Sequence, residues 1–454
     1  MTRASDARGH AVARVELESF DRQVRAACEV QHPDRYRLLD ALRADEPRIA
    51  RGGGVSYVAA SFGDGATTQH LAAFDRLLGF DAEHGRLVVE AGARVGDVQR
   101  FALAHGWYLP VTPGHPRASI GGCIAADVHG KNPARDGTFR AWVESIALHR
   151  PGRGILVADR TREARLFEAS FAGFGLTGTI VHATLRLARP PAALVLRRVP
   201  VASLSDAARV LREAGNAPVL YGWHDARATQ FGRGVIRIGL ASDGADVDSE
   251  DVDAGRARSR VRDLPERIAP LPFALWNRAG IALANGWLRR RWCRAGQAPL
   301  ALVDALFPLN DARTYFAGYG RAGMVEAQWL LPHARFEPFA AALADAVARA
   351  QPRIALVASK LFAGEASDLR FDGSGIALAL HLPAPTESRQ RAFLETLATI
   401  ATAHGGRPNL IKDSSLDADA TRAAIAGFEE ARARLRAHDR AGVYRSELSR
   451  RLRL

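Results

Sequence analysis

The sequence predicts an α+β protein of two domains, for three reasons. At 454 residues the chain exceeds a single ordinary core. Hydrophobic residues make up 47% and charged residues 24%, which is typical of a globular protein. In the second half, the order strand, helix, strand, strand, helix favours an antiparallel sheet with helices on one face.

The first half of the chain is rich in β-patterns. RLVVEAG (86–92) predicts a strand, and VGDVQRFALAHGW (95–107) predicts a short amphipathic helix stopped by Gly106. VESIALHR and ILVADR flank the turn PGRG (151–154), which predicts a hairpin. TIVHATLRL (179–187) alternates with a period of two and predicts the last strand of this part.

The segment ARPPAA (188–193) predicts a hinge, because its two prolines cannot continue a strand or a helix. Beyond it we expect two helices at about 333–351 and 386–404, an acidic insertion at 243–255 and a long helix at 417–437. Strands are expected at VLYGWHD, GVIRIGLAS, MVEAQWLLP, IALVASKLFAG and GIALALHLP.

The net charge of +13 invites an anionic partner. The arginines of the chain are spread along its length, without a zinc-finger, homeodomain or RNP-like pattern. We therefore expect no specific binding of nucleic acid. Cys28, Cys123 and Cys293 share no metal-ligand or redox spacing, so no metal site is expected. The N-terminus has no signal-peptide pattern and no apolar run is long enough to span a membrane, which together predict a cytoplasmic protein.

Lysine is scarce in this chain. Lys131, Lys360 and Lys412 are its only lysines among 62 basic residues, so the other 62 − 3 = 59 are arginines. Lysine offers a compact ammonium whose pKa burial can lower enough to exchange protons. A role that arginine cannot fill is therefore expected at these three positions.

Two glycine-rich segments are candidates for ligand binding. In RGGGVSY (51–57), three consecutive glycines let backbone N–H groups converge on an anion such as a pyrophosphate, although a plain tight turn is an equal alternative. In TPGHPRASIGGCIAADVHG (112–130), small residues leave room for a flat ligand beside His129. GFGLTG (173–178) spells G-x-G-x-x-G, but a helix precedes it and a strand follows, so we reject a nicotinamide Rossmann site.

These segments together resemble the vanillyl-alcohol oxidase type of flavoprotein, with its PCMH-type FAD-binding domain. Within it the chain most resembles the decaprenylphosphoryl-β-D-ribose oxidase family; sugar-lactone and alditol oxidases are more distant. RGGGVSY resembles the phosphate loop, PGHPRASIGGCIAADVHGKN the second flavin segment, and GLTGTI and IKDSS the remaining signatures. The resemblance runs from about residue 30 to the end.

The resemblance implies an FAD-binding domain (1–192), a substrate domain (193–406) and a C-terminal segment that returns to the FAD domain (407–454). FAD is expected without a covalent link, because Val55 replaces the histidine that bonds the flavin in some relatives. The implied FAD-binding residues are Gly52, Gly53, Gly54, Val55, Ser56, Gly114, Ser119, Ile120, Gly121, Gly122, Ala126, Asp127, His129, Ile180 and Asn409.

The implied catalytic residues are Lys412, Tyr57, Lys131, Lys360 and Gln328, so all three lysines fall on active-site positions. Lys412 is open to two roles, a cation that stabilises charge or a neutral base, with a salt bridge to Asp413 or another carboxylate as the alternative. The chain departs from the family at Phe174 (usually Asn), Asn409 (Tyr), Ala379 (Cys), Ala377 (Asn) and Glu326 (Gln).

The implied activity is FAD-dependent oxidation of a secondary hydroxyl of a sugar-type substrate, such as a polyprenyl-phosphoryl pentose, to a ketone in cell-envelope biosynthesis. The implied partners are a short-chain NAD(P)H reductase and the inner face of a membrane, touched peripherally. Two alternatives stay open: an aldonolactone or alditol oxidase that uses oxygen, and a basic binding protein without flavin.

Overall fold

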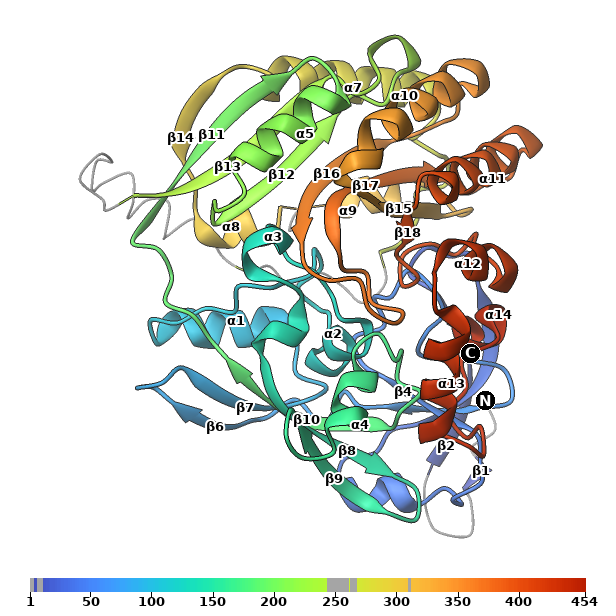
Figure 1. Cartoon of the computed structure of the whole chain (residues 1–454). Helices are drawn as coiled ribbons and strands as arrows, with labels where there is room; N and C mark the ends of the chain where they lie inside the picture. The colour runs from blue at the N-terminus through green and yellow to red at the C-terminus, as the bar shows by residue number, and fades with distance from the viewer. Residues whose placement is uncertain (1–3, 6–10, 243–260, 262–267, 309–311) are drawn as a thin grey trace.

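The computed structural model describes residues 4–5, 11–242, 261, 268–308 and 312–454, so the predicted acidic insertion lies outside the described residues. Helices and three sheets are mixed, which confirms the predicted α+β class (Figure 1). The first sheet has the order β1 (Ala4–Ser5), β2 (Ala11–Glu18), β3 (Arg25–Gln31), β5 (Thr67–His70) and β4 (Arg48–Arg51). The second has the order β6 (Leu77–Asp81), β7 (Arg86–Glu90), β10 (Thr179–Arg186), β8 (Val143–Arg150) and β9 (Gly154–Asp159).

The third sheet is antiparallel throughout, as the second half of the sequence predicts. Its order is β14 (Gly296–Pro299), β11 (Ala193–Val201), β13 (Gly234–Ser242), β12 (Val219–His224), β16 (Leu356–Ala363), β17 (Ser374–Pro383), β15 (Met324–Pro332) and β18 (Arg407–Pro408). Helices α5 (Leu204–Glu213), α10 (His333–Ala350) and α11 (Ser388–Ala403) cover one face, and α10 and α11 confirm the two helices predicted there.

Alternation along the strands decides which side chains face the helices. In β15, Val325, Ala327 and Trp329 belong to the core beneath α10 and α11. The residues between them, Glu326 and Gln328, point to the opposite face, because successive side chains of a strand alternate. The third sheet therefore has one apolar face and one face that carries polar groups.

The remaining helices lie between the strands or after the last of them. They are α1 (Val95–Ala104), α2 (Ile120–Ala126), α3 (Pro133–Asp136), α4 (Ala164–Ser170), α7 (Arg278–Trp292), α8 (Leu302–Leu306), α9 (Arg313–Ala317), α12 (Ala418–Ala424), α13 (Phe428–His438) and α14 (Glu447–Leu452). Short 3-10 turns occupy Tyr36–Asp40, Phe139–Trp142 and Ala228–Gln230. The hairpin β8–β9 and helix α1 are confirmed. GFGLTG lies between α4 and β10, the wrong context for a Rossmann loop, as predicted.

The predicted long helix at 417–437 is wrong. The structure has two helices there, α12 and α13, separated at residues 425–427. Gly427 precedes α13 with φ of +77°, a left-handed conformation that glycine adopts without strain and that interrupts a helix.

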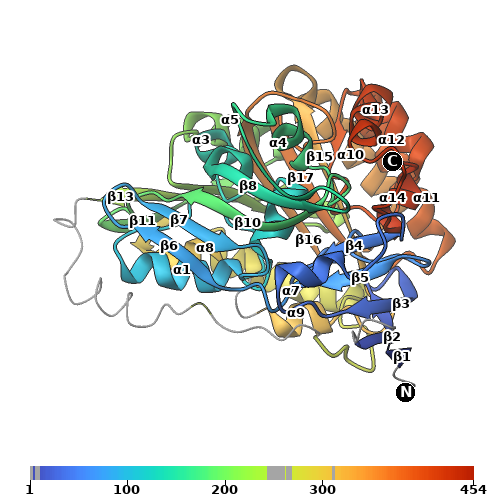
Figure 2. The same cartoon turned by 90° about the horizontal axis from the view of Figure 1, so that it is seen from below.

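The C-terminal helices lie beside the N-terminal strands in both views (Figures 1 and 2). The Arg48 N–H donates to the Val443 carbonyl at 2.8 Å, and the Asp64 N–H donates to Glu447 Oε1 at 2.8 Å. The chain enters the third sheet between β10 and β11, at the proline-containing segment. These contacts support our proposal that the chain returns to the first domain after residue 406.

Candidate active site

A cavity of about 600 Å³ lies between the glycine-rich segments and the polar face of the third sheet. Residues 52–57, which follow β4, form one wall, and the first turn of α2 with the segment before it forms another. Side chains from β12, β15, β16 and β17 close the opposite end. The two glycine-rich segments therefore face one cavity.

The glycine loop packs tightly against the segment that leads into α2. A Cβ on Gly53 would lie 2.0 Å from the Arg117 carbonyl oxygen, and one on Gly52 would lie 1.9 Å from Ser119 Oγ. Gly54 has φ of +67°. Glycine is thus required for the fold of the loop itself, whether or not the loop also binds a ligand.

Helix α2 begins at an N-cap serine and carries small residues into the cavity wall. Ser119 Oγ accepts a hydrogen bond from the Gly122 N–H at 3.2 Å, as an N-cap serine does. Asp127 ends the helix with φ of +43° and accepts hydrogen bonds from Thr138 Oγ1 and the Arg140 N–H, each at 3.0 Å. Burial raises the pKa of Asp127 to about 6.

The three lysines meet at one end of this cavity. Lys131 follows α2, Lys360 comes from β16 and Lys412 follows β18, and all three line the cavity. Lys360 Nζ donates to the Gly130 carbonyl at 2.8 Å and lies 3.2 Å from His129 Nδ1.

Two side-chain amides, linked by a hydrogen bond, hold the other side of the His129 ring. Gln328 Nε2 lies 3.1 Å from His129 Nε2, and Asn409 Nδ2 donates to Gln328 Oε1 at 2.7 Å. Burial, followed by the charges of Lys360 and Lys412, lowers the pKa of His129 well below its usual value, so the ring is neutral. His129 is therefore held in place by hydrogen bonds on both nitrogens.

Burial and mutual repulsion favour neutral amines at two of the lysines. Burial, followed by the charge of Lys412, lowers the pKa of Lys131 to about 7. Burial and the charges of Lys131 and Lys412 lower the pKa of Lys360 well below its usual range. The amine of Lys131 can therefore accept a proton near neutral pH, and burial favours the neutral amine at Lys360 as well.

Lys412 instead has a carboxylate partner. Glu326 lies opposite His381 in the β15–β17 pairing, and its Oε2 is 3.2 Å from both Lys412 Nζ and His381 Nε2. Burial opposes ionisation of Glu326, but Lys412 and His381 outweigh it and hold the pKa of this carboxyl far below its usual value. Lys412 Nζ also lies 4.0 Å from the centroid of the Tyr57 ring.

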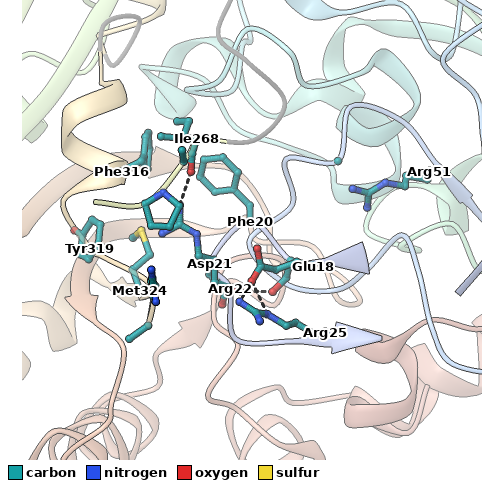
Figure 3. Close-up of a pocket in the computed structure, with 17 residues that line it drawn as sticks. Glu18, Phe20, Asp21, Arg22, Arg25, Arg51, Ile268, Phe316, Tyr319 and Met324 are labelled. Atoms are coloured by element: carbon teal, nitrogen blue, oxygen red, sulfur yellow. Dashed lines mark hydrogen bonds and ion pairs between the residues drawn. The ribbon is translucent and has the colours of Figure 1, made fainter. Parts of the chain in front are cut away.

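A second cavity of about 830 Å³ adjoins the first and shares Phe20, Gly54 and Phe316 with it. Figure 3 shows Phe20, Phe316 and Met324 on one side of it and the ion pair of Glu18 and Arg25 on the other. Arg22 donates to the Ile268 carbonyl at 2.6 Å. Of the predicted site residues, Gly54 alone lines it.

Known proteins similar to this chain bind FAD or are named as oxidases. Residues 37–157 match the family described as FAD binding domain. The decaprenylphosphoryl-β-D-ribose oxidase of Mycolicibacterium smegmatis is 26% identical over 89% of this chain and 89% of its own. The chain is an FAD-binding oxidoreductase. An uncharacterised protein of Streptomyces coelicolor is 28% identical over 78% of this chain and 98% of its own. The D-arabinono-1,4-lactone oxidase of Eremothecium gossypii is 32% identical over 27% of this chain and 24% of its own.

The first cavity fits a flavin nucleotide. A Cβ on Gly114 would meet no atom within 4 Å, so the wall there leaves open space beside the glycine loop. His115 Nε2 is buried at this wall and has no hydrogen-bond partner among the described residues, which leaves a polar atom for a ligand. The described residues contain no cluster of side chains that could hold a metal ion.

The structure places almost all the predicted site residues around the first cavity. Ile120 is the exception, because its side chain is fully buried in the core beside Ile124. Residues that line the cavity as predicted are Gly52, Gly53, Gly54, Val55, Ser56, Tyr57, Gly114, Ser119, Gly121, Gly122, Ala126, Asp127, His129, Lys131, Ile180, Gln328, Lys360, Asn409 and Lys412.

The departures from the family lie mostly in the same walls. Phe174, Ala379 and Glu326 line the cavity, whereas Ala377 packs against Leu330 and two phenylalanines. His381 also lines it, although the sequence patterns did not indicate it. Its signal is a single polar residue inside the apolar strand GIALALHLP.

Proposed function

We propose that the protein oxidises a secondary hydroxyl of a sugar-type substrate to a ketone, and that the substrate is a polyprenyl-phosphoryl pentose. The observation that carries the proposal is the meeting of the chain's three lysines in the cavity that the glycine loop lines. The relative from Mycolicibacterium smegmatis, whose name describes oxidation of a decaprenylphosphoryl ribose, supports the substrate class.

The bound flavin supplies a hydride acceptor, and the chain's own residues must manage the hydroxyl proton. Lys131 and Lys360 are suited to accept that proton, because burial favours their neutral amines. Gln328, Asn409 and His129 form a hydrogen-bonded wall that can orient the sugar.

Lys412 is better suited to a charge-stabilising role than to a base. Its Nζ forms an ion pair with Glu326 Oε2 at 3.2 Å. A fixed cation beside the reacting oxygen stabilises negative charge as it develops. Lys412 also forms a salt bridge, as the alternative role predicted, and its partner is Glu326. Asp413 is not that partner; it accepts a hydrogen bond from Ser415 Oγ at 2.5 Å.

A short-chain NAD(P)H reductase is our proposed partner, because reduction of the keto sugar from the other side would complete an epimerisation. An aldonolactone oxidase is the second candidate. It is favoured by the match to the Eremothecium gossypii enzyme, which covers 27% of this chain.

Anaerobic mixing with candidate substrates tests the proposal. Prenyl-phosphoryl pentoses should bleach the flavin absorbance, whereas aldonolactones and alditols should bleach it far more slowly. Fast bleaching by an aldonolactone, followed by rapid recovery in oxygen, would favour the second candidate and contradict the first.

A further inference from the structure

Helix α7 has an apolar outer face that no other described segment covers. Leu283 is 75% exposed and Trp287 is 61% exposed, and they lie four residues apart on one side of the helix. Phe273, just before the helix, is 60% exposed. These three are the most exposed large hydrophobic residues of the described chain, and neighbouring exposed residues such as Leu283 and Trp287 mark an interaction surface.

In the sequence of α7 and the residues on either side of it, from 268 to 303, every charge is positive. The segment 268–303 contains no Asp or Glu, and its basic residues are Arg278, Arg289, Arg290, Arg291 and Arg294. Arg290 and Arg291, in the last turn of α7, are exposed and form no ion pair with any residue that the structure describes. Exposed Trp and Leu next to unpaired arginines suit the boundary between acyl chains and anionic headgroups.

The inner side of the same helix borders the flavin cavity. Asn285 is buried, and its Oδ1 accepts a hydrogen bond from the Ala226 N–H at 3.2 Å. Trp292, the last residue of α7, lines the cavity and packs edge-on against Trp223 with ring centroids 5.9 Å apart. One helix thus separates the cavity from the exposed apolar face.

We propose that Phe273 and the outer face of α7 bind the surface of an anionic lipid membrane. This contact is peripheral, since no helix of the described residues is long and apolar enough to cross a membrane. It would bring a lipid-linked substrate from the bilayer to the cavity beside Trp292, a role that rests on the proposed function; the membrane contact itself rests only on the exposed face and its charges.

Sedimentation of the flavin-loaded protein with vesicles tests the surface. One set of vesicles contains phosphatidylglycerol in phosphatidylcholine, and the other contains phosphatidylcholine alone. The wild type should bind the anionic vesicles, and high salt should weaken binding. The Leu283→Glu/Trp287→Glu variant should bind at least about tenfold more weakly.

The matched control is Leu77→Glu/Leu78→Glu, which places the same charges on two exposed leucines of β6 far from α7 in the sequence. It should bind vesicles as the wild type does. Both variants should keep their flavin, which shows that they fold. Failure of the proposed function is detected separately, because bleaching by a soluble short-chain substrate needs no vesicles.

Equal vesicle binding by the wild type and the α7 variant would overturn the proposal. The proposal would also be overturned if the wild type did not bind vesicles but formed a dimer, and the α7 variant stayed monomeric. A second copy of the chain would then cover the face. Loss of binding in the α7 variant alone supports it.

Discussion

Lys131, Lys360 and Lys412 come from three distant parts of the sequence, yet they line one cavity. Their scarcity in an arginine-rich chain is enough to mark them as candidates from the sequence. The partner of Lys412 is not predictable in this way. Glu326 and His381 meet only because β15 and β17 pair in a register that places them opposite each other.

At the residue scale, Lys131 should give the reaction a pH dependence. Its pKa of about 7 means that the amine becomes protonated, and unable to accept a proton, as the pH falls through neutrality. We therefore expect the rate of flavin reduction by substrate to rise with pH through about 7 and then level off. In the Lys131→Met variant, the rate should no longer rise with pH through neutrality. A wild-type rate that does not change with pH through neutrality would exclude Lys131 as the base.

A substitution at Gly114 tests flavin binding without disturbing the packing of the glycine loop. A side chain at Gly53 would collide with the Arg117 carbonyl, so a variant there changes both. A side chain at Gly114 has open space. We expect Gly114→Val to unfold at the temperature of the flavin-free wild type, because bound flavin itself stabilises the fold, but to purify with little flavin, measured by the ratio of flavin to protein absorbance. A full complement of flavin would show that the ligand does not occupy this space.

At the element scale, strands and helices with clear periodicity were predictable, because burial of one face imposes the pattern on the residues. The β8–β9 hairpin and helices α10 and α11 are of this kind. The break between α12 and α13 was not, since a single glycine inside a helical pattern is compatible with either outcome. Ile120 was assigned to the flavin site from the resemblance, but the turn of α2 directs its side chain into the core.

The N-cap of α2 should matter for both stability and flavin binding. Ser119→Ala removes the hydrogen bond from the Gly122 N–H, which should lower the free energy of unfolding by about 1 kcal/mol. Ser203→Ala removes the equivalent N-cap bond of α5, from the Asp206 N–H, and should cost a similar amount. Because only Ser119 borders the cavity, only its variant should also release flavin more readily during dialysis. Equal flavin retention in both would place Ser119 outside the binding site.

At the scale of the whole molecule, the cavity needs both the N-terminal segments and the third sheet. The glycine loop and α2 supply one wall, and β15, β16 and β17 supply the other. The division into an FAD-binding and a substrate domain is an expectation from the resemblance; composition and periodicity alone do not predict the cavity, because they do not determine how two sheets face each other. Glu326 and Ala379, two of the departures from the family pattern, lie in the wall that the third sheet supplies.

The flavin should be released from the whole protein by denaturation. Val55 lines the cavity where some relatives carry a bonding histidine, and valine has no nucleophilic atom. Cys123 is buried, and burial raises the pKa of its thiol, so little reactive thiolate forms. Acid precipitation should therefore leave all the yellow colour in the supernatant. Colour in the protein pellet would demonstrate a covalent link.

The most direct test is the rate of anaerobic flavin bleaching by substrate in the wild type and two variants of Lys412. Lys412→Met removes the charge that Glu326 holds in the cavity and should slow bleaching by at least about a hundredfold while the flavin stays bound. Lys412→Arg keeps a cation without a usable base and should retain much of the rate. Bleaching by Lys412→Met at the wild-type rate would contradict the account, because the cation that Glu326 holds in the cavity would then take no part in the chemistry.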